Sequence, residues 1–181
     1  LTTAFPDPSL GNQLHMVARL IAARDKLGLK KQCFFCSIGG FDTHGEDQLA
    51  RQSELLGEIS AAVTAFYAAT VELSVADNVT TFTASDFGRT FTSNGRGSDH
   101  GWGGHHLVVG GAVQGGKLFG QFPVHTVRGP DDSGGQGNWI PTTSTEAYAA
   151  TLGRWFGADD AVLAQVFPRL QYFNGNVGFL G

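Results

Sequence analysis

The spacing of hydrophobic positions along the chain predicts an alternation of helices and strands. Apolar residues at intervals of three and four predict a helix over residues 12–27 that ends at Gly28. The nearly continuous apolar run at residues 33–38 is typical of a strand that is covered on both faces, as in a parallel sheet. A longer apolar stripe at helical spacing predicts a second helix over residues 56–73.

β-branched residues predict a second strand at residues 79–84, and a further apolar run predicts a third at residues 106–113. A strand, a helix and a strand joined by a crossover of this length favour parallel pairing. The pattern therefore predicts an α/β fold with a mostly parallel sheet and helices on both faces.

The second half of the chain contains more turns. Residues 88–105 form a long glycine-rich loop, and residues 114–140 show no regular pattern. Residues 143–146 fit a capping box that begins a helix ending at Gly157, and Asp159 is expected to cap a last short helix. We find neither a repeat nor a linker, so residues 1–181 are expected to form a single α/β domain.

Composition excludes several classes of protein. The chain is 41% hydrophobic and 15% charged, which is unlike a disordered protein. The formal charge is −4 and no basic run is longer than Lys30-Lys31, which argues against a nucleic-acid partner. No apolar stretch is long enough to predict a membrane span.

Polar side chains follow the predicted strands where a parallel sheet would bind ligands. Asp42 and His44 come after the first strand, and Asp86 and Arg89 come after the second. His100 lies in the loop that leaves the second strand. We therefore expect these five side chains to share one crevice.

Two carboxylates and two imidazoles suit one divalent metal ion, which could be zinc, manganese or calcium. The predicted metal ligands are Asp42, His44, Asp86 and His100, and Arg89 is the predicted catalytic residue, pairing with an anionic oxygen of the substrate. A structural role is the alternative for each, because an aspartate beside a glycine often makes a turn and a loop histidine is often only hydrogen-bonded.

Several motifs resemble those of a known family. They occupy residues 39–45 (Gly-Gly-Phe-Asp-Thr-His-Gly), 84–90 (Ala-Ser-Asp-Phe-Gly-Arg-Thr), 98–101 (Ser-Asp-His-Gly), 141–144 (Pro-Thr-Thr-Ser) and 149–157 (Ala-Ala-Thr-Leu-Gly-Arg-Trp-Phe-Gly). Together they resemble the bacterial domain-of-unknown-function family 1501, whose members look like distant relatives of alkaline phosphatases and sulfatases. The resemblance implies an exported protein in a periplasmic or secreted setting.

The resemblance also implies that the chain is the carboxyl-terminal part of a longer protein, with a fold that is incomplete at the N-terminus. The nucleophile region of the superfamily would then lie upstream. Asp42 and His44 resemble the ligands of one metal, Asp86 resembles an aspartate of the second, and His100 resembles the final metal histidine. Phe87 stands where the second metal's other histidine would be, so a two-metal site is not expected.

Two functions remain open at this point. The first is an exported metal-dependent hydrolase that acts on an anionic small molecule or on a phosphate or sulfate ester. The alternative is a non-catalytic secreted binding or assembly protein that retains the fold. A larger assembly is the third reading, and exposed apolar surface on the helix at residues 56–73 would favour it.

Overall fold

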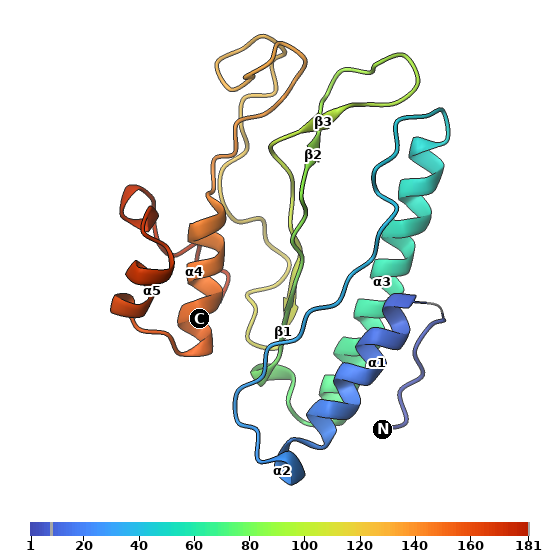
Figure 1. The fold of residues 1–181 in the computed structure, drawn as a ribbon, viewed down its shortest axis with the longest axis vertical. Helices are drawn as coiled ribbons and strands as arrows, with labels where there is room; N and C mark the ends of the chain where they lie inside the picture. Colours follow the sequence, from blue (N-terminus) through green and yellow to red (C-terminus); the bar gives the residue numbers. More distant parts are fainter. Residues whose placement is uncertain (8, 181) are drawn as a thin grey trace. The chain divides into compact units, whose positions relative to one another are not determined.

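The structure is a computed structural model that describes residues 1–7 and 9–180 (Figure 1). The chain divides into two compact units. The first unit contains Leu1–Thr81 with the short segments Gly95–Gly97 and Val109–Gly111, and the second contains Phe82–Asn94, Ser98–Val108 and Ala112–Gly181. A single domain over residues 1–181 therefore stays a prediction.

The first unit is built on two helices that lie side by side, α1 (Ser9–Ala22) and α3 (Gln48–Glu72) (Figure 1). The predicted apolar stripe of α1 is buried against α3. The buried core consists of Leu10, Leu14, Val17, Ala18, Ile21, Ala62, Phe66, Ala69 and Val75. The predicted helix ends as expected, because Gly28 takes the left-handed conformation (φ +67°) after the short helix α2 (Arg24–Leu27).

Small residues bring the two helices of this unit close together. Ala18, Ala62 and Ala69 are completely buried, so side-chain bulk does not separate the backbones at these positions. The predicted helix at 56–73 is confirmed, but it begins eight residues earlier, at Gln48. Its predicted apolar stripe is buried or packed on the core at every position except Leu56. Leu55 is buried, whereas Leu56 and Val71 are more than half exposed.

The buried strand predicted at residues 33–38 is wrong. This segment is extended but belongs to no ladder in the described structure, and the side chain of Phe35 is 92% exposed. The side-chain amide of Gln13 takes the place of a neighbouring strand at one position. Its Oε1 accepts from Ser37 N at 2.9 Å, and its Nε2 donates to Ser37 O at 2.8 Å.

The predicted fold class is also wrong. Strand β1 (Thr80–Phe82) pairs with β4 (Val108–Gly110), and β2 (Gly88–Arg89) pairs with β3 (His100–Gly101), in two separate ribbons. Both ribbons are antiparallel, and strands hold only 8% of the residues against 38% in helices. The described part of the protein has no mostly parallel sheet, because the chain between β1 and β4 forms the antiparallel β2–β3 ribbon, and residues 33–38 join neither ribbon.

The second unit carries the two carboxyl-terminal helices, α4 (Thr145–Phe156) and α5 (Asp160–Val166). Both predicted helices are confirmed, and α4 ends at Gly157 as expected (φ +100°). The cap of α4 lies one residue later than predicted, because the hydroxyl of Ser144 accepts from Ala147 N at 3.0 Å. Asp159 caps α5 as predicted, accepting from Val162 N at 2.8 Å.

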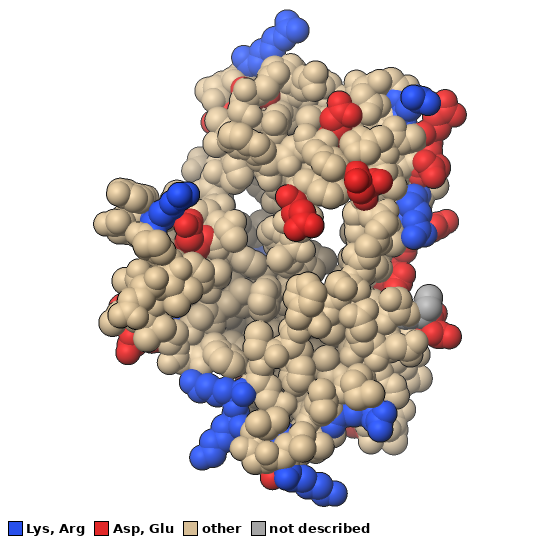
Figure 2. Space-filling model, viewed as in Figure 1, with Lys and Arg blue, Asp and Glu red and all other residues tan. Residues whose placement is uncertain are grey.

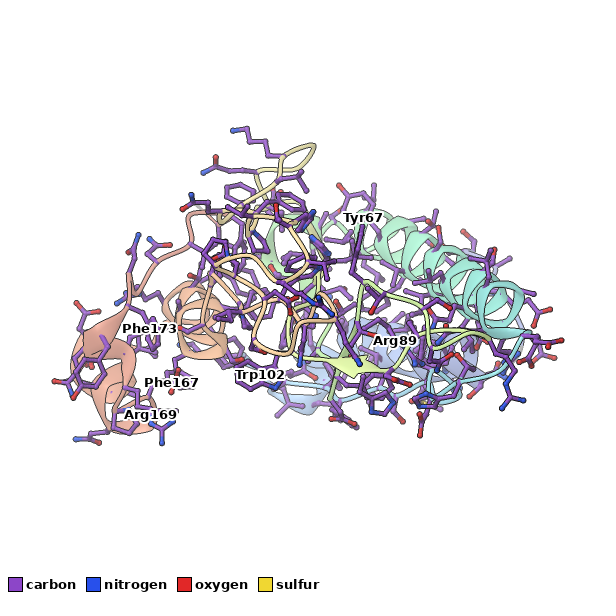
Figure 3. The ribbon with its side chains drawn as sticks, turned by 90° about the horizontal axis from the view of Figure 1, so that it is seen from above. Tyr67, Arg89, Trp102, Phe167, Arg169 and Phe173 are labelled. Carbon is purple, nitrogen blue, oxygen red and sulfur yellow. The ribbon has the colours of Figure 1, made fainter. Side chains whose placement is uncertain are left out.

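Two turns of 3-10 helix complete the described elements, η1 (Ala76–Asn78) in the first unit and η2 (Leu170–Tyr172) in the second. Figure 3 shows Phe167, Arg169 and Phe173 around α5 at the carboxyl-terminal end of the chain. Across the described residues, no helix combines the length and the apolar character that a bilayer crossing requires.

Candidate functional site

The predicted ligands of the first unit lie together in the loop that precedes α3. Asp42 Oδ1 and His44 Nε2 are 2.9 Å apart. The extended backbone through Thr43 sends both side chains the same way, as the sequence predicts. About two-thirds of the Asp42 side chain (67%) and 44% of the His44 side chain are exposed. The pair is therefore open to an incoming ion or ligand.

Helix α3 holds the backbone between these two side chains. Gln48 Nε2 donates to Thr43 O at 2.6 Å, and Gln52 Nε2 lies 3.3 Å from Thr43 Oγ1. Because both glutamines lie in the first turns of α3, the loop is fixed to a rigid element on which the spacing of Asp42 and His44 depends. The sequence pattern did not reveal these supports, since α3 was expected to begin only at residue 56.

The remaining predicted site residues belong to the second unit. The antiparallel ladder pairs Arg89 on β2 directly with His100 on β3. Asp86 is exposed in the bend just before β2. The ribbon depends on Gly88, because a Cβ there would lie 1.9 Å from the carbonyl oxygen of Gly103. The sequence predicted that the ends of parallel strands would bring Arg89 and His100 together, whereas the structure brings them together in an antiparallel hairpin.

Phe87 supports both of these side chains. Its ring stacks on the imidazole of His100 with centroids 3.8 Å apart and planes 11° from parallel. The guanidinium carbon of Arg89 lies 5.2 Å from the centroid of the Phe87 ring. Arg89 also donates from an Nη atom to Ser98 O at 2.7 Å. Phe87 contributes no ligand atom, but it orients one predicted metal ligand and the predicted anion-binding arginine, which Figure 3 labels.

Asp99 precedes the predicted ligand His100 in the sequence. Its Oδ1 accepts a hydrogen bond from Asn94 Nδ2 at 2.9 Å. Its backbone is fixed by Thr90, whose N–H donates to Asp99 O at 2.9 Å. Asp99 therefore helps to close the loop between β2 and β3.

A group of imidazoles and aromatic rings in the second unit escaped the sequence prediction. His105 lies 5.1 Å from Phe122, and His125 lies 5.8 Å from Phe122 and 5.0 Å from Trp139, measured between ring centroids. The ring of His106 packs on that of Tyr148 with centroids 5.7 Å apart, and partial desolvation, followed by the charge of His105, lowers the pKa of His106. These residues are far apart in the sequence, so no local motif could have signalled the group.

The sequence that carries these motifs also matches a known protein family. The profile of the family described as "Protein of unknown function (DUF1501)" matches residues 6–133. The chain belongs to this family. Neither a curated protein nor a solved structure gives a match.

The DUF1501 match includes every predicted site residue and the whole of the first helical pair. The motifs at residues 141–144 and 149–157, which lie at the start and in the body of α4, fall outside the matched range. The description of the DUF1501 family names no activity. The sulfatase-like chemistry and the exported setting stay predictions.

Proposed function

We propose that this DUF1501 protein is an exported, metal-dependent hydrolase-like protein that acts on an anionic ester, such as a phosphate or sulfate ester. The observation that supports this is the exposed pair of Asp42 and His44, whose ligand atoms lie 2.9 Å apart on a loop fixed to α3. A carboxylate and an imidazole so close together suit one divalent cation. Bound there, the cation would polarise an ester oxygen or activate water.

The second unit contributes the groups that an anionic substrate requires. The guanidinium of Arg89 carries a positive charge, which suits the oxygens of a phosphate or sulfate. Asp86 and His100 are the predicted further ligands. That they bind the same ion as Asp42 and His44 stays a prediction from the sequence.

Metal titration of the purified protein tests the proposal. We expect zinc, manganese or calcium to bind at one equivalent by isothermal titration calorimetry, and Asp42→Asn to weaken binding on the order of tenfold or more. Glu46→Gln is the matched control, because it removes a negative charge from the same exposed loop without touching the Asp42–His44 pair. Equal binding by both variants, or no stoichiometric metal at all, overturns the proposed metal site.

A panel of phosphate and sulfate esters then tests turnover. Hydrolysis that depends on the added metal and is lost in Asp42→Asn supports the hydrolase. Metal binding without hydrolysis of any ester supports the non-catalytic alternative.

That alternative, a secreted binding or assembly protein, is favoured by a separate observation. Large apolar side chains are exposed in the first unit. They include Phe35 at 92%, Leu49 at 84%, Leu56 at 54% and Val71 at 53%. Exposed apolar surface of this kind is typical of protein interfaces, and Leu56 and Val71 lie in the part of α3 for which it was expected in a larger assembly. Size-exclusion chromatography with light scattering tests it, because a monomer at all concentrations contradicts self-assembly.

A further inference from the structure

The solvent side of α1 and α2 is unusually apolar for the outer face of a helix. The inner face of α1 is already used, since Leu14, Val17 and Ile21 are buried against α3. On the outer side, Met16 and Leu27 are each 50% exposed and Leu20 is 38% exposed. Met16 and Leu20 lie one turn apart on α1, and Leu27 lies on α2 beyond the turn at Ala23, whereas an outer helix face is ordinarily polar.

Basic residues flank these apolar side chains. Residues 15–31 contain Arg19, Arg24, Lys26, Lys30 and Lys31 but only one acidic residue, Asp25, in a chain whose net charge is −4. Figure 2 shows Lys and Arg side chains gathered at the foot of the view, over α2 and the chain that follows it. The positions are too far apart in the sequence to form a basic run, and helical spacing brings them to one end of the unit.

The two sets of side chains are interleaved. His15, Arg19 and Lys26 directly precede Met16, Leu20 and Leu27 in the sequence, and they help to form an open hollow with Leu1. Leu29 continues the apolar surface beyond Gly28 and is 46% exposed. We call the surface formed by residues 15–31 on this side the basic–leucine face.

We propose that the basic–leucine face binds the surface of a bilayer that contains anionic lipids. A bilayer interface offers negative headgroups to lysine and arginine, and apolar chains just below them to leucine and methionine. The face supplies both kinds of group on α1, which packs on α3, and on α2 with the chain that follows it. This binding would place the protein on a membrane without crossing it, and it is independent of the proposed hydrolase activity.

Two other occupants fit the face less well. A second copy of the chain in a two-fold contact would set the same basic residues against each other, because such an interface uses one surface on both partners. A nucleic acid would neutralise the cations but would leave Met16, Leu20 and Leu27 without an apolar partner. Anionic lipid is the occupant that satisfies both the charges and the apolar side chains.

Vesicle sedimentation with the full chain tests the proposal. We expect the protein to sediment with vesicles of phosphatidylglycerol and phosphatidylcholine in equal parts, and not with vesicles of phosphatidylcholine alone. Binding should weaken as salt is raised, because surface charges are screened. The double variant Arg19→Gln/Lys26→Gln should lower the affinity on the order of tenfold. Its control, Lys117→Gln/Arg169→Gln, removes two exposed charges from the second unit and should bind as the unchanged protein does.

The apolar part of the face needs its own pair of variants. Leu20→Gln/Leu27→Gln should also weaken vesicle binding, whereas Leu118→Gln/Val166→Gln, at positions 79% and 60% exposed in the second unit, should not. All four substitutions replace exposed side chains, and circular dichroism checks that each protein is folded. Undiminished binding by Leu20→Gln/Leu27→Gln overturns the proposal in favour of simple electrostatic adsorption.

Three further results would overturn the proposal. They are absence of vesicle binding, equal binding to neutral vesicles, and release of the protein from anionic vesicles by duplex DNA at equal phosphate concentration. Sedimentation velocity without lipid tests whether a second copy of the chain occupies the face instead. A dimer that is lost in Leu20→Gln/Leu27→Gln would assign the face to that second copy.

Discussion

The carboxylate of Asp132 organises a stretch of chain that has no helix or strand. Backbone N–H groups of Arg128, Gly134, Gly135, Gly137 and Asn138 donate to its two oxygens at 2.8–3.1 Å. Burial raises the pKa of this carboxyl, but the hydrogen bonds outweigh that effect and hold the pKa well below its usual range. With its oxygens committed in this way, Asp132 is a structural residue and not a metal ligand.

Asp132→Asn should loosen the loop at residues 128–138, because an amide cannot accept at both positions. We expect amide hydrogen exchange at residues 134–138 to accelerate roughly tenfold or more. Asp131→Asn is the matched control, since the neighbouring Asp131 accepts one backbone bond, from Val124 N. Similar exchange rates in the two variants would show that the five bonds do not hold the loop.

The same carboxylate predicts a dependence on pH. A lowered pKa means that the folded form is favoured above the unfolded pKa of about 4, and that this stabilisation is lost as pH falls from there toward the folded pKa. The difference in unfolding free energy between the unchanged protein and Asp132→Asn should therefore be full at neutral pH and shrink below about pH 4. Chemical denaturation at several pH values measures it, and a difference that grows in acid contradicts the assignment.

Glu72 fixes the amino-terminal residues to the end of α3. The Thr3 hydroxyl donates to its carboxylate, and backbone N–H groups of Thr2 and Thr3 donate as well, so the pKa of Glu72 is lowered to about 2. Thr3→Val removes the hydroxyl bond that lowers the pKa of Glu72 most and should raise that pKa, whereas Thr2→Val leaves the backbone bonds and should raise it less. Carboxyl titration by NMR compares the two variants, and equal pKa values would contradict the role of the Thr3 hydroxyl.

At the scale of elements, the helical pair α1 and α3 is the main source of stability in the first unit. Its apolar core follows from two stripes at helical spacing, and each stripe is buried because the other covers it. The adjacent residues Phe66 and Tyr67 show that burial depends on which side of α3 a residue occupies. Phe66 is 4% exposed, whereas Tyr67 is 38% exposed.

Phe66→Ala should destabilise the protein by about 3–5 kcal/mol, because it removes a buried ring and leaves a cavity. Tyr67→Ala, one residue away, should cost under about 1 kcal/mol, since its ring keeps contact with solvent. Urea unfolding followed by circular dichroism at the helix band measures both changes. Equal losses would mean that the packing of α1 on α3 does not define this core.

At the scale of the whole molecule, the predicted site residues are distributed over two units. Asp42 and His44 belong to the first, and Asp86, Arg89 and His100 belong to the second. The charge is uneven as well, because five of the twelve basic residues lie within residues 15–31. Metal binding and membrane binding would therefore depend on different parts of the chain.

His100→Gln tests whether the second unit supplies a ligand to the metal ion. If it does, this variant should lower metal affinity on the order of tenfold, and the double variant with Asp42→Asn should lose less than the sum of the two single losses. His125→Gln is the control, because that histidine packs between Phe122 and Trp139 in the same unit. An affinity unchanged by His100→Gln excludes His100 as a ligand.

The sequence by itself determined the local features of this protein. The helix containing residues 56–73, the stops at Gly28 and Gly157, and the cap at Asp159 could all be predicted. So could the helical character of residues 12–27, although the structure divides them at Ala23 into α1 and α2. Each depends on residues within a few positions of each other, through helical periodicity, a left-handed glycine or a side-chain cap. The pairing of Asp42 with His44 was predictable for the same reason.

Only the tertiary structure decided which extended segments pair and what each side chain touches. An apolar run such as residues 33–38 looks like a buried strand, but a strand exists only when another segment completes its hydrogen bonds, and here Gln13 does so at a single residue. The stacking of Phe87 on His100 and the gathering of cations beside Leu20 and Leu27 likewise bring together groups that are separated along the chain. Contacts of this kind depend on how the whole backbone turns back on itself, which local spacing does not encode.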